Sequence, residues 1–184
     1  MIFPRRAAVP ADVLARADLA RGERVLAHAP ADDGTWLLGT RDALVVVEPA
    51  ETIRLAWETV ESADWDRDTA RLGVAEVGEY GQPRPVHRFT LDDPQRLLQL
   101  VRERVTASVL LQRRVEVRGR RGLTVIARRP PRGRGEITWA YELDDGMDPA
   151  DPEVARAAEA GLRAARQDIG QDIGQDVGLD GEPI

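Results

Sequence analysis

Arginine dominates one stretch of this chain. Residues 113–135, RRVEVRGRRGLTVIARRPPRGRG, hold nine arginines and one acid, Glu116, in a protein whose formal net charge is −6. Guanidinium groups bind phosphate and carboxylate oxygens through paired N–H donors. The stretch therefore predicts a candidate anion-binding patch, which consists of Arg118, Arg120, Arg121, Arg128, Arg129, Arg132 and Arg134.

Such a patch suits two kinds of partner. An anionic membrane surface attracts each nearby basic residue by about 1 kcal/mol, and nucleic acid offers the same phosphate chemistry with a strong salt dependence. Two features oppose both partners. Residues 142–184 carry twelve acids and three arginines. If this acidic segment folds back on the patch, its carboxylates compete with an external anion for the arginines. No aromatic residue lies among the arginines to stack on a base.

The alternation of apolar residues in the same stretch favours a structural role instead. If the loop around Gly119 to Gly122 has an odd number of residues, strands over 113–118 and 123–129 form a hairpin whose apolar side has the facing pairs Val117–Leu123 and Val115–Val125, together with Ala127. The opposite side carries Arg114, Glu116, Arg118, Thr124, Ile126 and Arg128. On this interpretation the arginines form a solvated sheet face with partial ion pairing.

A third strand, over residues 136–143, continues the pattern. Its inward residues are Ile137, Trp139, Tyr141 and Leu143, and its outward residues are Glu136, Thr138, Ala140 and Glu142. If this strand pairs antiparallel with 123–129, its glutamates lie beside the outward arginines.

Residues for nucleophilic catalysis are scarce. The chain has no cysteine, and neither Ser62 nor Ser108 lies in a Gly-x-Ser-x-Gly turn. His28 and His87 lie in expected strands, where a half-buried histidine is commoner than a catalytic base. No phosphate-binding loop or dinucleotide motif occurs. We therefore expect no enzymatic activity and no cofactor.

The run DWDRD, residues 64–68, places Asp64, Asp66 and Asp68 at alternate positions, as at the start of a calcium-binding loop. An EF-hand then requires glycine where Thr69 stands and glutamate where Ala75 stands. The pattern fails at both positions, so we expect a strand that enters a turn and no metal site.

Length and hydropathy indicate one domain with a small extension in a chain of 184 residues. The N-terminus lacks the apolar run of a signal peptide, and nowhere do about eighteen apolar residues follow one another. We therefore expect a soluble cytoplasmic protein.

Short apolar or alternating runs predict seven strands in the first half of the chain. They cover residues 23–29, 35–40, 43–48, 52–57, 60–66, 71–77 and 86–91. A helix over 94–112 follows, with Asp93 as its cap and Pro94 at its first position. Its apolar stripe consists of Leu97, Leu98, Val101, Val105 and Val109.

Three stretches resemble bacterial pleckstrin-homology-like (PH-like) and GRAM-like domains. They are GERVLAHA (22–29), WLLGTRDALVVV (36–47) and IRLAWETVESADWD (53–66). The resemblance implies a seven-stranded antiparallel barrel with a C-terminal capping helix over residues 20–112. It does not imply phosphoinositide binding, because the first hairpin loop, APADDGT, carries Asp32 and Asp33 where lipid-binding members have basic residues. The whole chain also resembles an actinobacterial protein family with no assigned activity.

The predicted architecture is therefore α+β. An N-terminal arm with a short helix (1–19) precedes the PH-like domain (20–112), and a β-β-β-α extension (113–167) ends in a helix over 152–167 with the apolar stripe Val154, Ala158, Leu162 and Ala165. An acidic repeat tail (168–184) follows, which we expect to be flexible because glycine recurs at every fourth position. We expect a non-enzymatic protein that recognises another protein; the alternative is peripheral binding of anionic lipid or nucleic acid through the hairpin 113–135.

Overall fold

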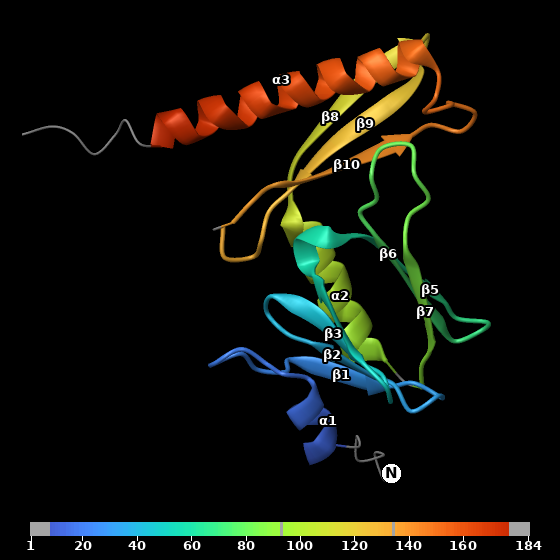
Figure 1. Cartoon of the computed structure of the whole chain (residues 1–184), viewed down its shortest axis with the longest axis vertical. Helices are drawn as coiled ribbons and strands as arrows, with labels where there is room; N and C mark the ends of the chain where they lie inside the picture. The colour runs from blue at the N-terminus through green and yellow to red at the C-terminus, as the bar shows by residue number, and fades with distance from the viewer. Residues whose placement is uncertain (1–7, 93, 134, 177–184) are drawn as a thin grey trace, which may run out of the picture.

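The computed structural model describes residues 8–92, 94–133 and 135–176, with side chains as far as residue 170. Its fold is α+β, as predicted, and consists of three antiparallel sheets and three α-helices in the described residues (Figure 1). In that part of the chain, no helix has the length and apolar character needed to cross a membrane.

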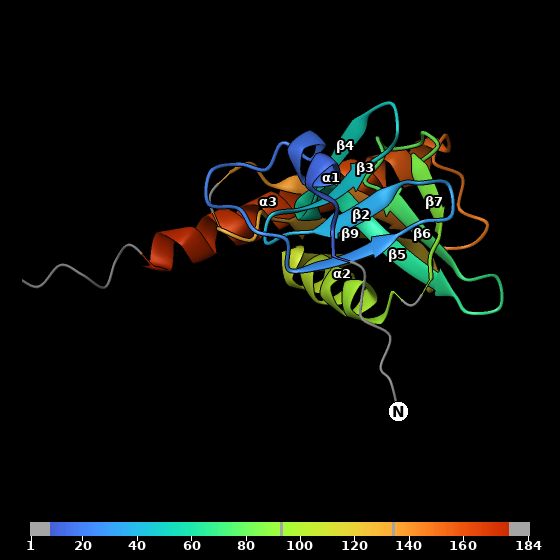
Figure 2. The ribbon, with the colours of Figure 1, turned by 90° about the horizontal axis from the view of Figure 1, so that it is seen from below.

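The first sheet has the order β1-β2-β3-β4, from Ala27–Pro30, Trp36–Gly39, Ala43–Val47 and Thr52–Ala56. Helix α1 (Ala11–Arg16) and helix α2 (Gln95–Ser108) lie on opposite sides of this sheet (Figure 2). All five residues of β3 are buried because Leu44 and Val46 face the cluster with α2, whereas Val45 and Val47 face the cluster with α1. Because both faces of β3 are buried, every position in this strand favours an apolar residue, which explains its unbroken apolar sequence.

The second sheet has the order β5-β6-β7, from Val60–Asp66, Arg71–Glu76 and Val86–Thr90, and a short 3-10 helix (Trp57–Thr59) leads into it. The seven predicted strands are therefore present before α2. Over the described residues they form two separate sheets and no closed barrel. The barrel itself is not confirmed.

Helix α2 ends at Ser108, four residues earlier than predicted, and Val109 already belongs to β8. Within the predicted stripe, Leu97 and Val101 are buried, and Leu98 and Val105 pack against the same core. The helix stops because the next residues pair with β9, Leu111 opposite Ala127. At the other end, Pro94 precedes the first helical residue, and the predicted cap, Asp93, lies outside the described residues.

The third sheet has the order β10-β9-β8, from Thr138–Leu143, Arg121–Arg128 and Val109–Arg118. Its hairpin register differs from the prediction by two residues: Val115 pairs with Leu123, and Arg113 pairs with Val125. A two-residue turn that begins at Gly119 (φ 61°) and a bulge between Glu116 and Arg118 produce the shift. Gly122 permits the bulge, since a Cβ there would lie 1.9 Å from the carbonyl oxygen of Val115.

The apolar side of this sheet is nevertheless the predicted one. Leu123 and Val125 are buried beneath helix α3 (Pro152–Asp176), and Trp139, Tyr141 and Leu143 pack against the same cluster. The predicted stripe of α3 is confirmed, because Val154, Ala158, Leu162 and Ala165 all belong to that cluster.

Helix α3 continues to Asp176, nine residues beyond the predicted end, and the rest of the tail, 177–184, lies outside the described residues. Two contacts hold the added turns. Asp168 pairs with Arg113, and Ile169 is buried. Both contacts favour helix around Gly170, a residue that costs a helix about 1 kcal/mol.

Candidate functional site

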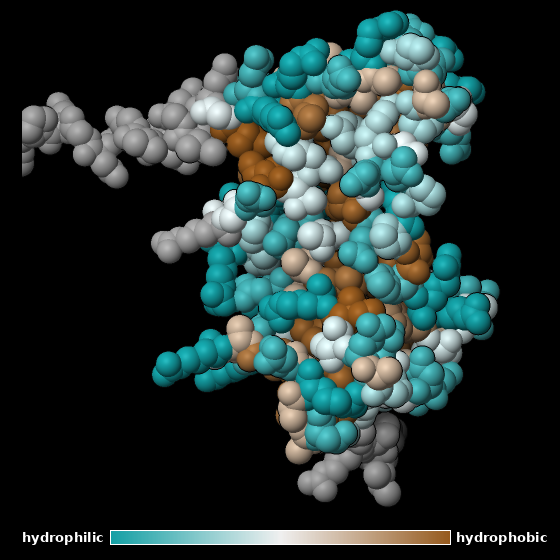
Figure 3. Space-filling model, viewed as in Figure 1, coloured by the Kyte–Doolittle hydropathy of each residue, from teal (hydrophilic) through white to brown (hydrophobic). Residues whose placement is uncertain are grey.

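A groove runs between strand β5 and helix α2. Its volume is about 400 Å³, within the range of ligand clefts. From β5 and β6 it is lined by Glu61, Ser62, Ala63, Trp65 and Leu72, and from α2 by Leu98, Val101, Arg102, Val105 and Thr106. In the same view as Figure 1, Figure 3 shows hydrophobic surface in the lower half of the molecule, where α2 and the β5–β7 sheet meet.

The floor of this groove is continuous with the main core. Leu72 and Val101 are buried, whereas Trp65, Leu98 and Val105 are only partly buried and pack against that core. Leu98, Val101 and Val105 follow the i, i+3, i+7 spacing of one helix face, which the sequence pattern predicted. The groove is therefore apolar at its base and reachable from outside.

One wall of the groove is an open sheet edge. Strand β5 is the first strand in the order β5-β6-β7, so β6 is its one strand neighbour in the part of the chain that the structure describes. Along an edge strand, every second residue directs its N–H and C=O away from the sheet. The carbonyl of Glu61 already accepts a hydrogen bond from Arg128 Nη2 (2.7 Å), which closes the edge at that end.

Glu61 forms the closed end of the groove and also lies at the base of a second cleft, of about 370 Å³, beneath the 78–84 loop. Its side chain is buried. Arg84 Nη1 lies 2.8 Å from Glu61 Oε1, although the geometry is not that of a hydrogen bond. Burial raises the pKa of Glu61 above 4.5, and the charges of Arg84 and Arg128 oppose that shift.

Arg128 is buried beside Glu61 at the end of α2. Its Nη1 donates to the carbonyl of Val105 (3.0 Å) and to Ser108 Oγ (2.8 Å). It therefore caps a helix C-terminus, where carbonyl groups lack partners and a positive charge is favoured. The expectation that Arg128 faces water with Ile126 and Ala140 is wrong, because all three are buried at this junction between the sheets.

At the hairpin turn, acidic residues of the described chain occupy the predicted patch. Arg118 pairs with Asp151 (2.6 Å) and with Glu153 (3.2 Å), and Arg114 pairs with Asp144. Arg120 and Arg121 are exposed and make no ion pair among the described side chains. These competing acids lie in residues 144–153, just before α3 and at its first residues, within the acidic segment 142–184 that the sequence indicated.

The remaining arginines of the patch lie at the other end of β9. Arg121 and Arg128 lie seven positions apart, which corresponds to about 23 Å along a strand. Arg132 pairs with Asp42 (2.7 Å), and the main-chain N–H of Arg129 donates to the Ser108 carbonyl. Arg134 lies outside the described residues. The structure therefore does not bring the seven arginines together.

Comparison with protein-family models gave no match, and comparison with curated proteins found no similar sequence. The likeness to PH-like domains stays a prediction from the sequence.

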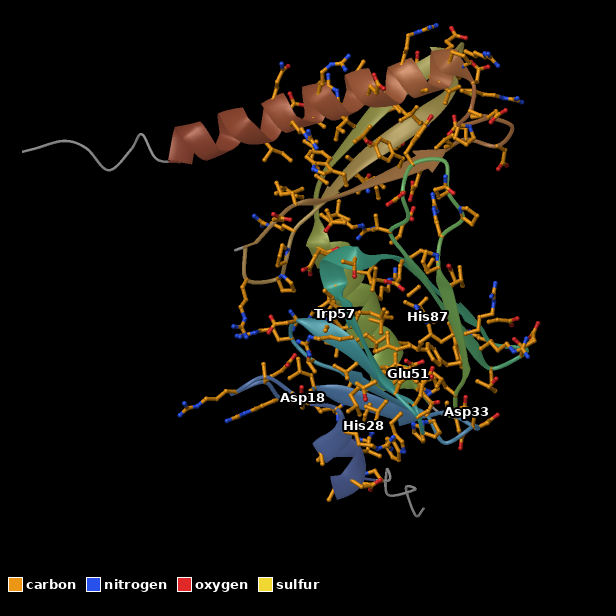
Figure 4. The ribbon with its side chains drawn as sticks, in the orientation of Figure 1. Asp18, His28, Asp33, Glu51, Trp57 and His87 are labelled. Atoms are coloured by element: carbon orange, nitrogen blue, oxygen red, sulfur yellow. The ribbon has the colours of Figure 1, made fainter. Side chains whose placement is uncertain are left out.

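The other polar candidates have structural contacts. His28 and His87 lie on β1 and β7, in different sheets (Figure 4), and His87 Nε2 is 2.7 Å from Glu76 Oε1. Asp66 accepts hydrogen bonds from the N–H groups of Asp68 and Thr69, which closes the β5–β6 turn. Within the described residues, no cluster of three or more metal-ligating side chains occurs.

The three stretches that resemble PH-like domains, 22–29, 36–47 and 53–66, are joined by one hydrogen-bond network, which the sequence did not reveal. The Thr40 hydroxyl lies 2.6 Å from Glu23 Oε1, and Trp57 Nε1 donates to the Thr40 carbonyl (3.2 Å). Arg54 also pairs with Glu23 at 2.8 Å. Burial alone would raise the pKa of Glu23, but hydrogen bonds from Arg54, Thr40 and the Ala20 N–H outweigh it and lower that pKa. This network ties the segment before β1 to β4 and to the end of β2, and so helps to fix the first sheet.

Proposed function

We propose that this protein is a non-enzymatic recognition module that binds another protein by adding an extended segment of the partner to the edge of β5. One observation carries the proposal: an open sheet edge and an apolar groove coincide along the same strand. In strand addition, main-chain hydrogen bonds supply affinity, and alternate side chains enter pockets to supply specificity.

The groove favours a particular kind of segment. Side chains of an added strand alternate between the two faces of the sheet, so every second one enters the groove. The aliphatic side chains of Leu98 and Val105 and the ring of Trp65 offer apolar contacts there. A partner segment with apolar residues at alternate positions is therefore expected to bind.

We further propose that residues 20–108 form a PH-like scaffold for this groove. The order of seven strands followed by an amphipathic helix supports this assignment. The fold alone says little about function, so the proposal depends on the groove. Ion pairs at Arg114, Arg118 and Arg132 weigh against the alternative, which is anionic lipid or nucleic-acid binding by the hairpin 113–135.

A phage-displayed library of random peptides tests the proposal. Wild-type protein is expected to select peptides with alternating apolar residues, and the bound peptide should shift the amide resonances of residues 62–66 in NMR spectra. Thr106→Trp fills the groove from an exposed helix position and should weaken binding at least about tenfold. Ala107→Trp is the matched control, since Ala107 is an exposed neighbour outside the groove.

Three results would overturn the proposal. The library yields no specific peptide, or selected peptides bind Thr106→Trp as tightly as wild type, or the shifted resonances lie away from β5 and α2. Turnover of a metabolite by purified protein that selects no peptide would favour an enzyme instead.

A further inference from the structure

The groove contains one unbalanced charge. Of the described side chains that line it, only Glu61 and Arg102 are charged. Glu61 lies beside Arg84 at 2.8 Å and near Arg128, so its charge is compensated. Arg102 is exposed and has no ion pair or hydrogen bond among the described residues. The guanidinium of Arg102, without a partner among the described residues, therefore lies on the side of the groove that α2 forms.

The acidic residues near Arg102 in the described chain do not form an ion pair with it. Asp64 and Asp66 of β5 line a different surface hollow, together with Arg71 and Arg88. On α2 itself, Glu103 is exposed, accepts a hydrogen bond from Gln99 Nε2 (2.9 Å) and lies outside the groove lining. The groove therefore presents positive charge above an apolar floor.

The position of Arg102 on the helix defines where a negative charge would lie. Leu98, Arg102 and Thr106 are spaced four residues apart, so they follow one another along one face of α2. Arg102 is the middle member of this row. A carboxylate that meets it belongs to the middle of a bound segment and not to the C-terminus of the partner.

We propose that the partner is an acidic peptide segment, in which an Asp or Glu side chain pairs with Arg102 and is flanked by apolar residues that enter the groove. This inference rests on the proposed strand addition at β5. Guanidinium and carboxylate groups form paired, charge-assisted hydrogen bonds, so Arg102 acts as a specificity determinant in addition to the main-chain pairing.

Synthetic peptides selected by the wild-type protein provide the test, each made with its central acid and with the matching amide (Glu→Gln or Asp→Asn). We expect the amide peptide to bind wild-type protein roughly fivefold more weakly than the acidic peptide, because the lost ion pair contributes about 1 kcal/mol. Arg102→Gln should bind the two peptides equally, and Arg102→Glu should prefer a lysine-substituted peptide. Arg96→Gln, at an exposed position on α2 outside the groove, should discriminate as wild type does.

The outcomes separate the two proposals. If wild type selects apolar alternating peptides without a central acid, or if Arg102→Glu leaves the preference unchanged, the acidic partner is wrong, while strand addition stands. If no peptide binds wild type, both proposals fail. Discrimination that falls with added salt and disappears in Arg102→Gln alone supports the acidic partner.

Discussion

Arg128 donates a hydrogen bond from Nη2 to the main-chain carbonyl of Glu61, 2.7 Å away, although the two residues lie 67 positions apart. The bond connects β9 of the third sheet to β5 of the second. Because the same guanidinium also caps α2 through the Val105 carbonyl, one side chain fixes three elements at the end of the groove. The third sheet is thereby tied to the candidate site.

Arg128→Met is expected to lower the free energy of unfolding by about 3 kcal/mol. The change leaves the Glu61 carbonyl and the hydroxyl of Ser108 without the Arg128 donor, takes one of two side-chain donors from the Val105 carbonyl, and removes a buried charge near Glu61. Urea denaturation monitored by tryptophan fluorescence measures the effect. Arg129→Met is the control, since Arg129 is an exposed neighbour, and should change stability by less than about 0.5 kcal/mol. Equal effects of the two variants would contradict the capping role.

Glu61 should make stability depend on pH. Burial raises its folded-state pKa above 4.5, so the folded protein holds this proton more tightly than the unfolded chain does. The stability that this group contributes is present below 4.5 and is lost as pH rises through the folded-state pKa. Glu61→Gln does not titrate. The unfolding free energy of the variant minus that of wild type should therefore increase as pH rises from about 4.5 through the folded-state pKa of Glu61.

Glu23 should change the unfolding free energy with pH in the opposite direction to Glu61. Its folded-state pKa lies below 4.5, so its contribution is present above 4.5 and is lost as pH falls through the folded-state pKa. For Glu23→Gln the same difference should decrease as pH rises from the folded-state pKa of Glu23 to about 4.5, and it should then stay level. Parallel pH profiles of the two variants would rule out the assigned pKa directions.

The sequence predicted the strands well because each one carries a local signal. The runs at β2 to β7 have β-branched or alternating apolar residues bounded by Gly, Pro and Asp, and the structure places a strand within each. The alternation of β8 to β10 also identified the side that α3 covers. These features depend on neighbours within a few positions, which a single sequence contains.

The groove and the junction depend on long-range contacts, which a single sequence does not contain. Alternation placed Arg128 on a solvated face, but the packing of the third sheet against Glu61 and the end of α2 buries it. That β5 is an edge strand follows from sheet order and not from its own residues. The arginine patch was an expectation from charge counting, which does not specify where acids such as Asp151 lie.

Asp144 should titrate at an unusually low pH. Hydrogen bonds from Arg114 and from the Gly122 N–H (2.9 Å) lower the pKa of Asp144 to about 2. NMR titration of the side-chain carboxyl carbon measures this value. Arg114→Gln removes the largest cause and should move the pKa toward 3.8, whereas Arg120→Gln, at an exposed position with no ion pair to any described side chain, should leave it nearly unchanged. A pKa near 3.8 in wild type would refute the pairing.

Two glycines of α3 should respond in opposite directions to alanine. At Gly161 a Cβ would lie 2.6 Å from Val115 Cγ2 and 3.1 Å from Val125 Cγ2, so the helix is seated closely on the sheet. Alanine at position 161 gains about 1 kcal/mol in helix propensity, but overpacking against the sheet costs about 1 to 3 kcal/mol and outweighs that gain. At Gly170 no described neighbour lies within 4 Å of such a Cβ. Gly170→Ala should stabilise the protein by up to about 1 kcal/mol in urea denaturation, whereas Gly161→Ala should destabilise it by about the same amount. If Gly161→Ala also stabilises, the close seating of α3 on β8 and β9 is wrong.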